Sequence, residues 1–131
     1  MKYMLMMNCP KTGYDSFGSL SKEDIQAHLR FMMNFNKALK ESGEWVSAEG
    51  LDNPHQAKSV RAGKSGTPIT DGVFAETKEY LAGFWIVQVD NPEQAYALAA
   101  RASAVPGAGG VPMNMPIEVR QVMSGPPEDL R

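Results

Sequence analysis

The chain is organised around the stretch Thr70-Asp71-Gly72-Val73-Phe74-Ala75-Glu76-Thr77-Lys78-Glu79, which continues directly into Tyr80-Leu81-Ala82-Gly83-Phe84-Trp85-Ile86-Val87-Gln88-Val89-Asp90. The first part gathers carboxylates, a lysine and a phenylalanine around a glycine turn. The second part is the most apolar segment of the protein, and residues 81–89 predict a buried central strand. Dense charge beside a core strand marks this region as a candidate site.

Before this stretch, the pattern predicts a strand over residues 2–7, a loop over 8–18 and a long helix. Ser21 is a preferred N-cap, Asp24 is the acidic residue of a capping box, and Gly43 ends the helix. Residues 44–51 alternate as a strand, and residues 57–62 and 67–70 predict a hairpin around 63–66. The faces of the 44–51 strand are expected to carry Trp45, Ser47 and Glu49 on one side and Val46, Ala48 and Gly50 on the other.

After the central strand, Asn91 and Pro92 predict the start of a second helix that stops before Pro106. A loop over 105–115 and a last strand over 116–123 follow. The order of elements predicts an α+β fold, a ferredoxin-like split βαβ with a β-hairpin insertion. Two helices cover only one face of such a sheet, so we expect a sheet-to-sheet homodimer. Residues 1–123 are expected to form a single domain and residues 124–131 a flexible C-terminal tail.

The composition excludes several classes of function. The chain has 131 residues, a net charge of −2 and a pI of about 5.7, so no basic face is expected for nucleic acid. No segment approaches the roughly 20 apolar residues that cross a membrane. A lone cysteine, Cys9, excludes an intramolecular disulfide and fits the reducing cytoplasm. His28 and His55 are not in a ligand-spaced cluster, so no metal is expected; no dinucleotide or flavin fingerprint is present, so no cofactor is expected.

Two polar residues interrupt the apolar stripe of the first helix. Asn36 is interpreted either as a core amide satisfied by the backbone or as a ligand contact. His28 lies at the edge of the stripe, where it either pairs with Asp24 one turn back or takes part in chemistry.

The motif at 70–79 resembles the D-G-P-F-A-E-x-K-E signature of the YCII-related family, also called DGPF-domain proteins. The similarity extends to residues 1–5, Gly43, 49–51, 81–84, Asp90 and 118–120, and leaves out the 104–115 loop and the tail. This resemblance implies a ferredoxin-like fold that dimerises into an α/β barrel. It also implies His28 and Asp71 as candidate catalytic residues. The chain departs from the signature at Val73, where proline is usual, which relaxes the turn after Gly72.

These residues give a first picture of a site. Asp71 would orient the His28 imidazole for proton transfer, or it would only cap its own Asx-turn. Further candidates for substrate binding are Glu76, Phe74, Trp85, Asn36, Arg61 and Arg120. The two arginines would hold an anionic substrate, or be ordinary exposed strand charges. Lys78 and Glu79 are interpreted as a solvated charged run.

Three functions remain open at this level. The first is a small-molecule enzyme with lyase-type or isomerase-type acid–base chemistry and a pocket at the dimeric barrel. The second is a non-catalytic small-ligand-binding or regulatory module. The third is a purely structural dimer. The identity of the small-molecule ligand is left open by the sequence.

Overall fold

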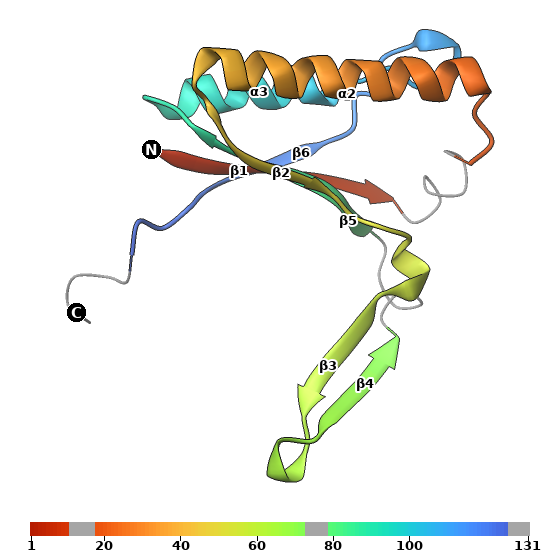
Figure 1. Ribbon diagram of the computed structural model, residues 1–131, viewed down its shortest axis with the longest axis vertical. Helices are drawn as coiled ribbons and strands as arrows, with labels where there is room; N and C mark the ends of the chain where they lie inside the picture. Colours follow the sequence, from red (N-terminus) through yellow and green to blue (C-terminus); the bar gives the residue numbers. More distant parts are fainter. Residues whose placement is uncertain (11–17, 73–78, 126–131) are drawn as a thin grey trace.

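The computed structural model describes residues 1–10, 18–72 and 79–125. Figure 1 shows two helices on one face of a four-stranded sheet and a separate two-stranded hairpin that extends from the opposite side. The described sheet is antiparallel and open, so the predicted α+β class is confirmed, and one chain does not form a closed barrel.

The four-stranded sheet has the order β2-β5-β1-β6. Its strands are β1 (Lys2–Pro10), β2 (Trp45–Gly50), β5 (Glu79–Gln88) and β6 (Ile117–Gln121). β5 runs antiparallel to both β2 and β1, and β1 runs antiparallel to β6. β1 and β2 are therefore parallel with β5 between them, which is the split βαβ arrangement. The predicted central position of the 81–89 segment is confirmed.

Helix α2 (Lys22–Ser42) has the predicted ends. The Ser21 side chain accepts a hydrogen bond from the Asp24 backbone N–H, and Gly43 adopts a left-handed φ of 80° beyond the last turn. Glycine takes this φ without the steric cost of a Cβ. The Asp24 carboxylate, however, accepts from the Gly109 N–H at 3.2 Å, so it ties α2 to a distant turn.

Helix α3 (Pro92–Ser103) begins as predicted, with the Asn91 side chain accepting from the Gln94 N–H. Its buried residues are mostly small, namely Ala95, Leu98, Ala99 and Ala102. Small side chains let a helix approach a sheet closely, and α3 contacts both β6 and β1. The core lies between the helices and the sheet, and its largest fully buried side chains are Leu5, Leu39, Val87 and Val105.

Two strand predictions were wrong. The first strand continues through Asn8 and Cys9 to Pro10, which pairs with Glu79. A β-bulge between Met7 and Asn8 shifts the register, and the pairing with β5 continues beyond it. A second bulge lies between Trp45 and Ser47 in β2. It places Trp45 and Ala48 together against the core, whereas strict alternation had put them on opposite faces.

The predicted hairpin is confirmed. Strands β3 (Lys58–Ala62) and β4 (Pro68–Gly72) pair in register, with the short 3-10 turn η2 (Lys64–Gly66) at the tip. A similar turn, η1 (Pro54–Gln56), leads into the hairpin from β2, and η3 (Ala108–Gly110) lies in the loop after α3. All of β4 is exposed, and the hairpin stands away from the helices (Figure 1).

Candidate functional site

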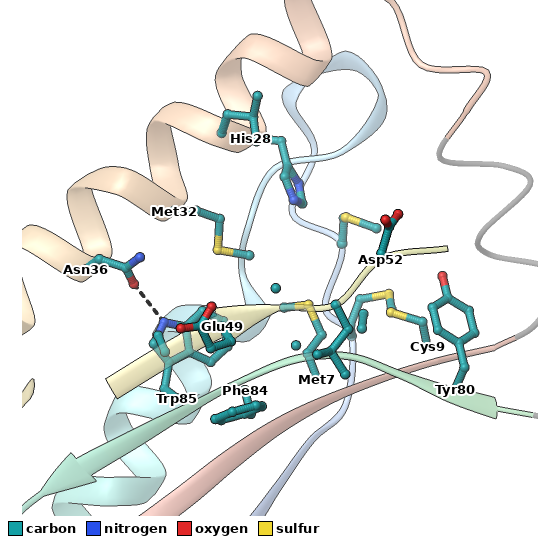
Figure 2. Close-up of a pocket in the computed structure, with 18 of the residues that line it drawn as sticks. Met7, Cys9, His28, Met32, Asn36, Glu49, Asp52, Tyr80, Phe84 and Trp85 are labelled. Carbon is teal, nitrogen blue, oxygen red and sulfur yellow. Dashed lines mark hydrogen bonds between the residues drawn. The ribbon is translucent and has the colours of Figure 1, made fainter. Parts of the chain in front are cut away.

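A cavity of about 420 Å³ lies between α2 and the sheet within one chain. α2, β1, β2 and β5 contribute to its wall, together with the segment that follows β2 and the loop that precedes β6. Figure 2 shows His28, Met32 and Asn36 reaching from α2 toward the strands. A volume of this size lies within the roughly 300–1,000 Å³ range of small-molecule sites.

Sulfur-containing side chains make up much of the apolar lining. They are Met7, Cys9, Met32, Met113 and Met115. Methionine is unbranched and has three rotatable bonds, so such a lining adapts to ligands of different shape. The methionine-rich composition of the chain therefore serves this cavity as well as the core.

His28 is held in one orientation by the loop after α3. Its Nδ1 lies 3.1 Å from the Pro106 carbonyl oxygen. A carbonyl oxygen only accepts, so Nδ1 carries the proton in this contact. In the neutral imidazole, Nε2 is then the nitrogen without a proton. The predicted partner of His28 one turn back, Asp24, instead binds Gly109, and both side chains thus secure the same loop.

Asn36 and Trp85 form one end of the cavity. The Trp85 Nε1–H donates to the Asn36 Oδ1 at 2.7 Å, as the dashed line in Figure 2 marks. Phe35 packs edge-on against the Trp85 ring, with centroids 5.5 Å apart and planes at 89°. The Asn36 oxygen therefore has a side-chain partner, whereas a backbone partner was expected, and the residue also lines the cavity.

Cys9 and Tyr80 are cross-strand neighbours at the other end. Burial raises the pKa of the Cys9 thiol above its ordinary value of 9.0, a hydrogen bond with Tyr80 opposes the rise, and the charge of Glu79 adds to it. Cys9 is therefore a protonated thiol at neutral pH. A thiol is a poor nucleophile compared with a thiolate, so this residue acts as part of the wall.

The lining also includes two acidic residues, Glu49 near the end of β2 and Asp52 in the segment after it, and Figure 2 shows their carboxylates well apart. Both residues are exposed. Asp52 Oδ1 accepts from the Asn53 N–H at 2.7 Å, which fixes the start of the turn after β2. None of the described lining residues is a lysine or an arginine.

The structure brings three of the predicted site residues together, His28, Asn36 and Trp85. Asp71 is elsewhere in the chain: it lies on the exposed hairpin, where its Oδ2 is 3.7 Å from Arg61 Nη2. Arg120 lies on β6 with its Nε 4.0 Å from Glu118 Oε2. Neither of the two arginines lines the cavity, and Asp71 does not line it either.

Phe74 and Glu76, the two remaining candidates, lie outside the described residues, as does Val73. Sequence reasoning missed Cys9, Glu49, Asp52 and Tyr80 as cavity residues. The similarity to a family at residues 49–51 was a signal for Glu49. The other three lie at strand ends and turns. The long-range pairing of β1 with β5 brings Cys9 and Tyr80 together, and Asp52 reaches the cavity from the segment after β2.

Within the described ranges, no group of three or more histidine, cysteine, aspartate or glutamate side chains could hold a metal ion. None of the helices described is long and apolar enough to cross a membrane. Comparison with protein families gives a match between residues 1–117 and the YCII-related domain. No curated protein matches the chain.

Proposed function

The chain belongs to the YCII-related family, and from this premise we propose that it binds a small organic molecule beneath α2 and exchanges a proton with it through His28. The observation that carries the proposal is the contact of His28 Nδ1 with the Pro106 carbonyl at 3.1 Å in the cavity wall. It presents Nε2 as the basic nitrogen in a fixed orientation, as a general base requires.

The proposed chemistry is of the lyase or isomerase type, in which His28 takes a C–H proton from the bound molecule. In an isomerisation the proton returns to another carbon, and in an elimination it passes to the leaving group as the C=C bond forms. A positioned base contributes about 10²- to 10⁴-fold to the rate of such a step. The Pro106 carbonyl takes the orienting role that the sequence had given to Asp71, because Asp71 pairs with Arg61 on the hairpin. Asp71→Asn is therefore expected to exchange the ligand proton at the same rate as the wild type.

The experiment has two stages. A metabolite library is first screened for compounds that raise the melting temperature, and each hit is then incubated with the protein in D₂O. Proton NMR should show loss of a C–H signal of the ligand with the wild type. His28→Gln should still bind the hit and lose most of the exchange. His55→Gln is the matched control, because His55 is exposed in η1 and does not line the cavity.

The second candidate function is a binding module without catalysis. The position of Asp71 supports it, since this residue lies beside Arg61 on the hairpin and does not line the cavity of its own chain. In that case hits bind to the wild type and to His28→Gln, and neither protein promotes deuterium exchange. A library without any hit would contradict both functions.

We further propose that two copies of the chain pair through the uncovered face of the sheet. Met4 and Met6 on β1 are the register partners of Ile86 and Phe84 on β5. These four apolar residues lie only half-buried in one chain. Both helices cover the opposite face, and pairing of two uncovered faces would remove this apolar surface from water (Figure 1). The α/β barrel implied by the family resemblance would be formed in this way.

A further inference from the structure

We infer that the Asn36 amide anchors the ligand, and that its Nδ2–H group donates a hydrogen bond to the carbonyl oxygen of a neutral, mostly apolar molecule. The inference rests on the proposed function, because it names the class of molecule that the same cavity takes. It differs from the anionic substrate that Arg61 and Arg120 would hold, since neither arginine lines the cavity.

The first argument is the orientation of the Asn36 amide. An indole N–H only donates, so the Asn36 atom that lies 2.7 Å from Trp85 Nε1 is the oxygen. Figure 2 shows the nitrogen on the other side of the amide, away from Trp85. Within the described residues, the hydrogen bond of the Asn36 side chain uses Oδ1 alone. The two Nδ2 hydrogens therefore remain as donors in a residue that lines the cavity.

The second argument is that this donor is held in place. Phe35 packs edge-on against the Trp85 ring, and both residues are buried, at 3 % and 6 % exposed. A half-turn of the Asn36 amide would set its NH₂ group against the indole N–H, with two donors facing each other. The amide is therefore fixed before a ligand arrives, and such a donor loses little freedom on binding.

The third argument is the nature of the wall around Asn36. Most of the lining is apolar, and among its described members only His28 can carry a positive charge. Burying a carboxylate without a cationic partner is costly, and a buried hydroxyl needs an acceptor for its own proton. A carbonyl oxygen has no net charge and only accepts hydrogen bonds. It is therefore the polar group that best matches a single amide donor in an apolar cavity.

The position of Asn36 also fits proton exchange at His28. The two residues lie on the same side of α2 with Met32 between them, and both line the cavity. They are two turns apart, about 12 Å along a helix, so a ligand that contacts both is elongated.

A carbonyl bound at Asn36 acidifies a C–H bond near His28 if a C=C bond conjugates the two groups. When the proton passes to His28, the electron pair of the C–H bond moves through this system onto the carbonyl oxygen. The Asn36 N–H group stabilises the resulting negative charge. Return of the proton to the carbon beside the carbonyl group restores the C=O bond and completes an isomerisation.

The test compares three probes with the same phenyl body: the ketone 4-phenylbutan-2-one, its alcohol 4-phenylbutan-2-ol, and 3-phenylpropionate, in which an oxygen anion replaces the methyl group of the ketone. Ligand-observed NMR measures their affinities for the full chain at pH 7. The ketone is expected to bind about tenfold more tightly than the anion and several-fold more tightly than the alcohol.

Asn36→Asp keeps an oxygen for the Trp85 N–H and replaces the NH₂ group by a second oxygen. The ketone should bind this variant about tenfold more weakly. The order of ketone and alcohol should reverse, because the alcohol can donate to the new carboxylate. Asn34→Asp is the matched control, since it adds the same charge at an exposed position of α2 and should leave all three affinities unchanged.

Infrared spectroscopy of the ketone labelled with ¹³C at its carbonyl group gives a second measurement that needs no variant. A hydrogen bond weakens the C=O bond, so the bound ketone should absorb at a lower frequency with the wild type than in hexane. In Asn36→Asp this shift should be lost.

Equal or tighter binding of 3-phenylpropionate would overturn the inference. So would an unchanged affinity of the ketone for Asn36→Asp, a C=O frequency that does not fall on binding, or the failure of all three probes to bind at millimolar concentration. None of these results would remove the proposed function, which fails separately if the metabolite library gives no hit.

Discussion

At the residue scale, the hydrogen bond between Trp85 and Asn36 is the most informative contact of the cavity. It joins β5 to α2 at 2.7 Å across the site, and it orients the indole that forms part of the wall. A buried N–H that loses its acceptor pays the cost of desolvation without compensation. The Asn36 side chain is therefore as important for stability as it is for the shape of the cavity.

Asn36→Leu is expected to lower the free energy of unfolding by about 1–3 kcal/mol, because it leaves the Trp85 N–H buried without this acceptor. Urea denaturation followed by tryptophan fluorescence measures the loss. Asn34→Leu is the matched control, since Asn34 is exposed on the same helix. Equal effects of the two substitutions would contradict the assigned role of Asn36.

The Cys9 thiol predicts a pH dependence of stability. Burial raises its folded-state pKa above the 9.0 of the unfolded chain, so the folded state retains a proton that the unfolded state has released. The free energy of unfolding therefore falls as the pH rises from about 9 toward the folded-state pKa. Below pH 9 both states are protonated and this contribution is constant.

Cys9→Ala should accordingly be less stable than the wild type at pH 7, from lost packing, and the difference between the two should narrow between pH 9 and pH 10.5. Urea titrations of both proteins across this range measure it, and groups common to both proteins cancel in the difference. A gap that widens with pH would mean that the thiolate is favoured in the folded state.

The residue scale also marks the limit of sequence reasoning about the site. His28 and Asn36 were found because polar residues inside an apolar stripe of a helix are conspicuous. The pairing of Asp71 with His28 stays a prediction, because a motif defines neighbours along the chain and does not define which residues of other elements or of a second copy lie beside it. The structure assigns Asp71 to Arg61 on the hairpin.

At the element scale, β2 and β5 face each other at a pair of glycines. Gly50 and Gly83 are register partners. A Cβ on Gly83 would lie 2.9 Å from the Glu49 carbonyl oxygen, whereas a Cβ on Gly50 would meet no atom of the described chain within 4 Å. Glu49, Gly50 and Gly83 all line the cavity, so the contact between these two strands also forms part of the cavity wall.

Gly83→Ala is expected to cost about 1–3 kcal/mol, because the backbone of β2 has to move away from β5. Gly50→Ala at the facing position should be neutral or slightly stabilising. Thermal unfolding of the two variants measures the contrast. If both substitutions lowered the melting temperature equally, the cost would arise from the strand in general and not from the contact with Glu49.

The elements themselves were largely predictable. Ser21 and Gly43 mark the ends of α2, and Asn91 marks the start of α3, through hydrogen bonds or backbone angles that depend on a few adjacent residues. The faces of β2 were not predictable, because the bulge between Trp45 and Ser47 arises from pairing with β5. No local pattern contains that information, since a single inserted residue exchanges the two faces of the strand that follows.

At the scale of the whole molecule, the order of elements determined the α+β fold, and the cavity had to be found in three dimensions. The sequence pointed to a pocket at a dimeric barrel. The cavity described here lies within one chain, between α2 and the sheet. Its volume depends on the distance between α2 and the sheet. Side chains from several segments that are far apart in the sequence determine that distance together.

The proposed dimer gives a prediction at this scale. Ile86→Lys places a charge on the uncovered sheet face and is expected to shift a dimer toward monomer at micromolar concentration in sedimentation velocity. Val60→Lys is the control, because Val60 is 59 % exposed on the hairpin, away from the sheet face. A wild type that sediments only as monomer would contradict the proposal. If only Val60→Lys dissociated the dimer, the interface between the two copies would include the hairpin and not the sheet face.

The hairpin of β3 and β4 also has a consequence for how the protein can diverge. Its tip at Lys64–Gly66 is exposed, and its strands contribute nothing to the buried core. Insertions or deletions at the tip would therefore leave the core and the cavity wall unchanged. The length and charge of this arm can therefore change without a change in the residues that line the α2 cavity.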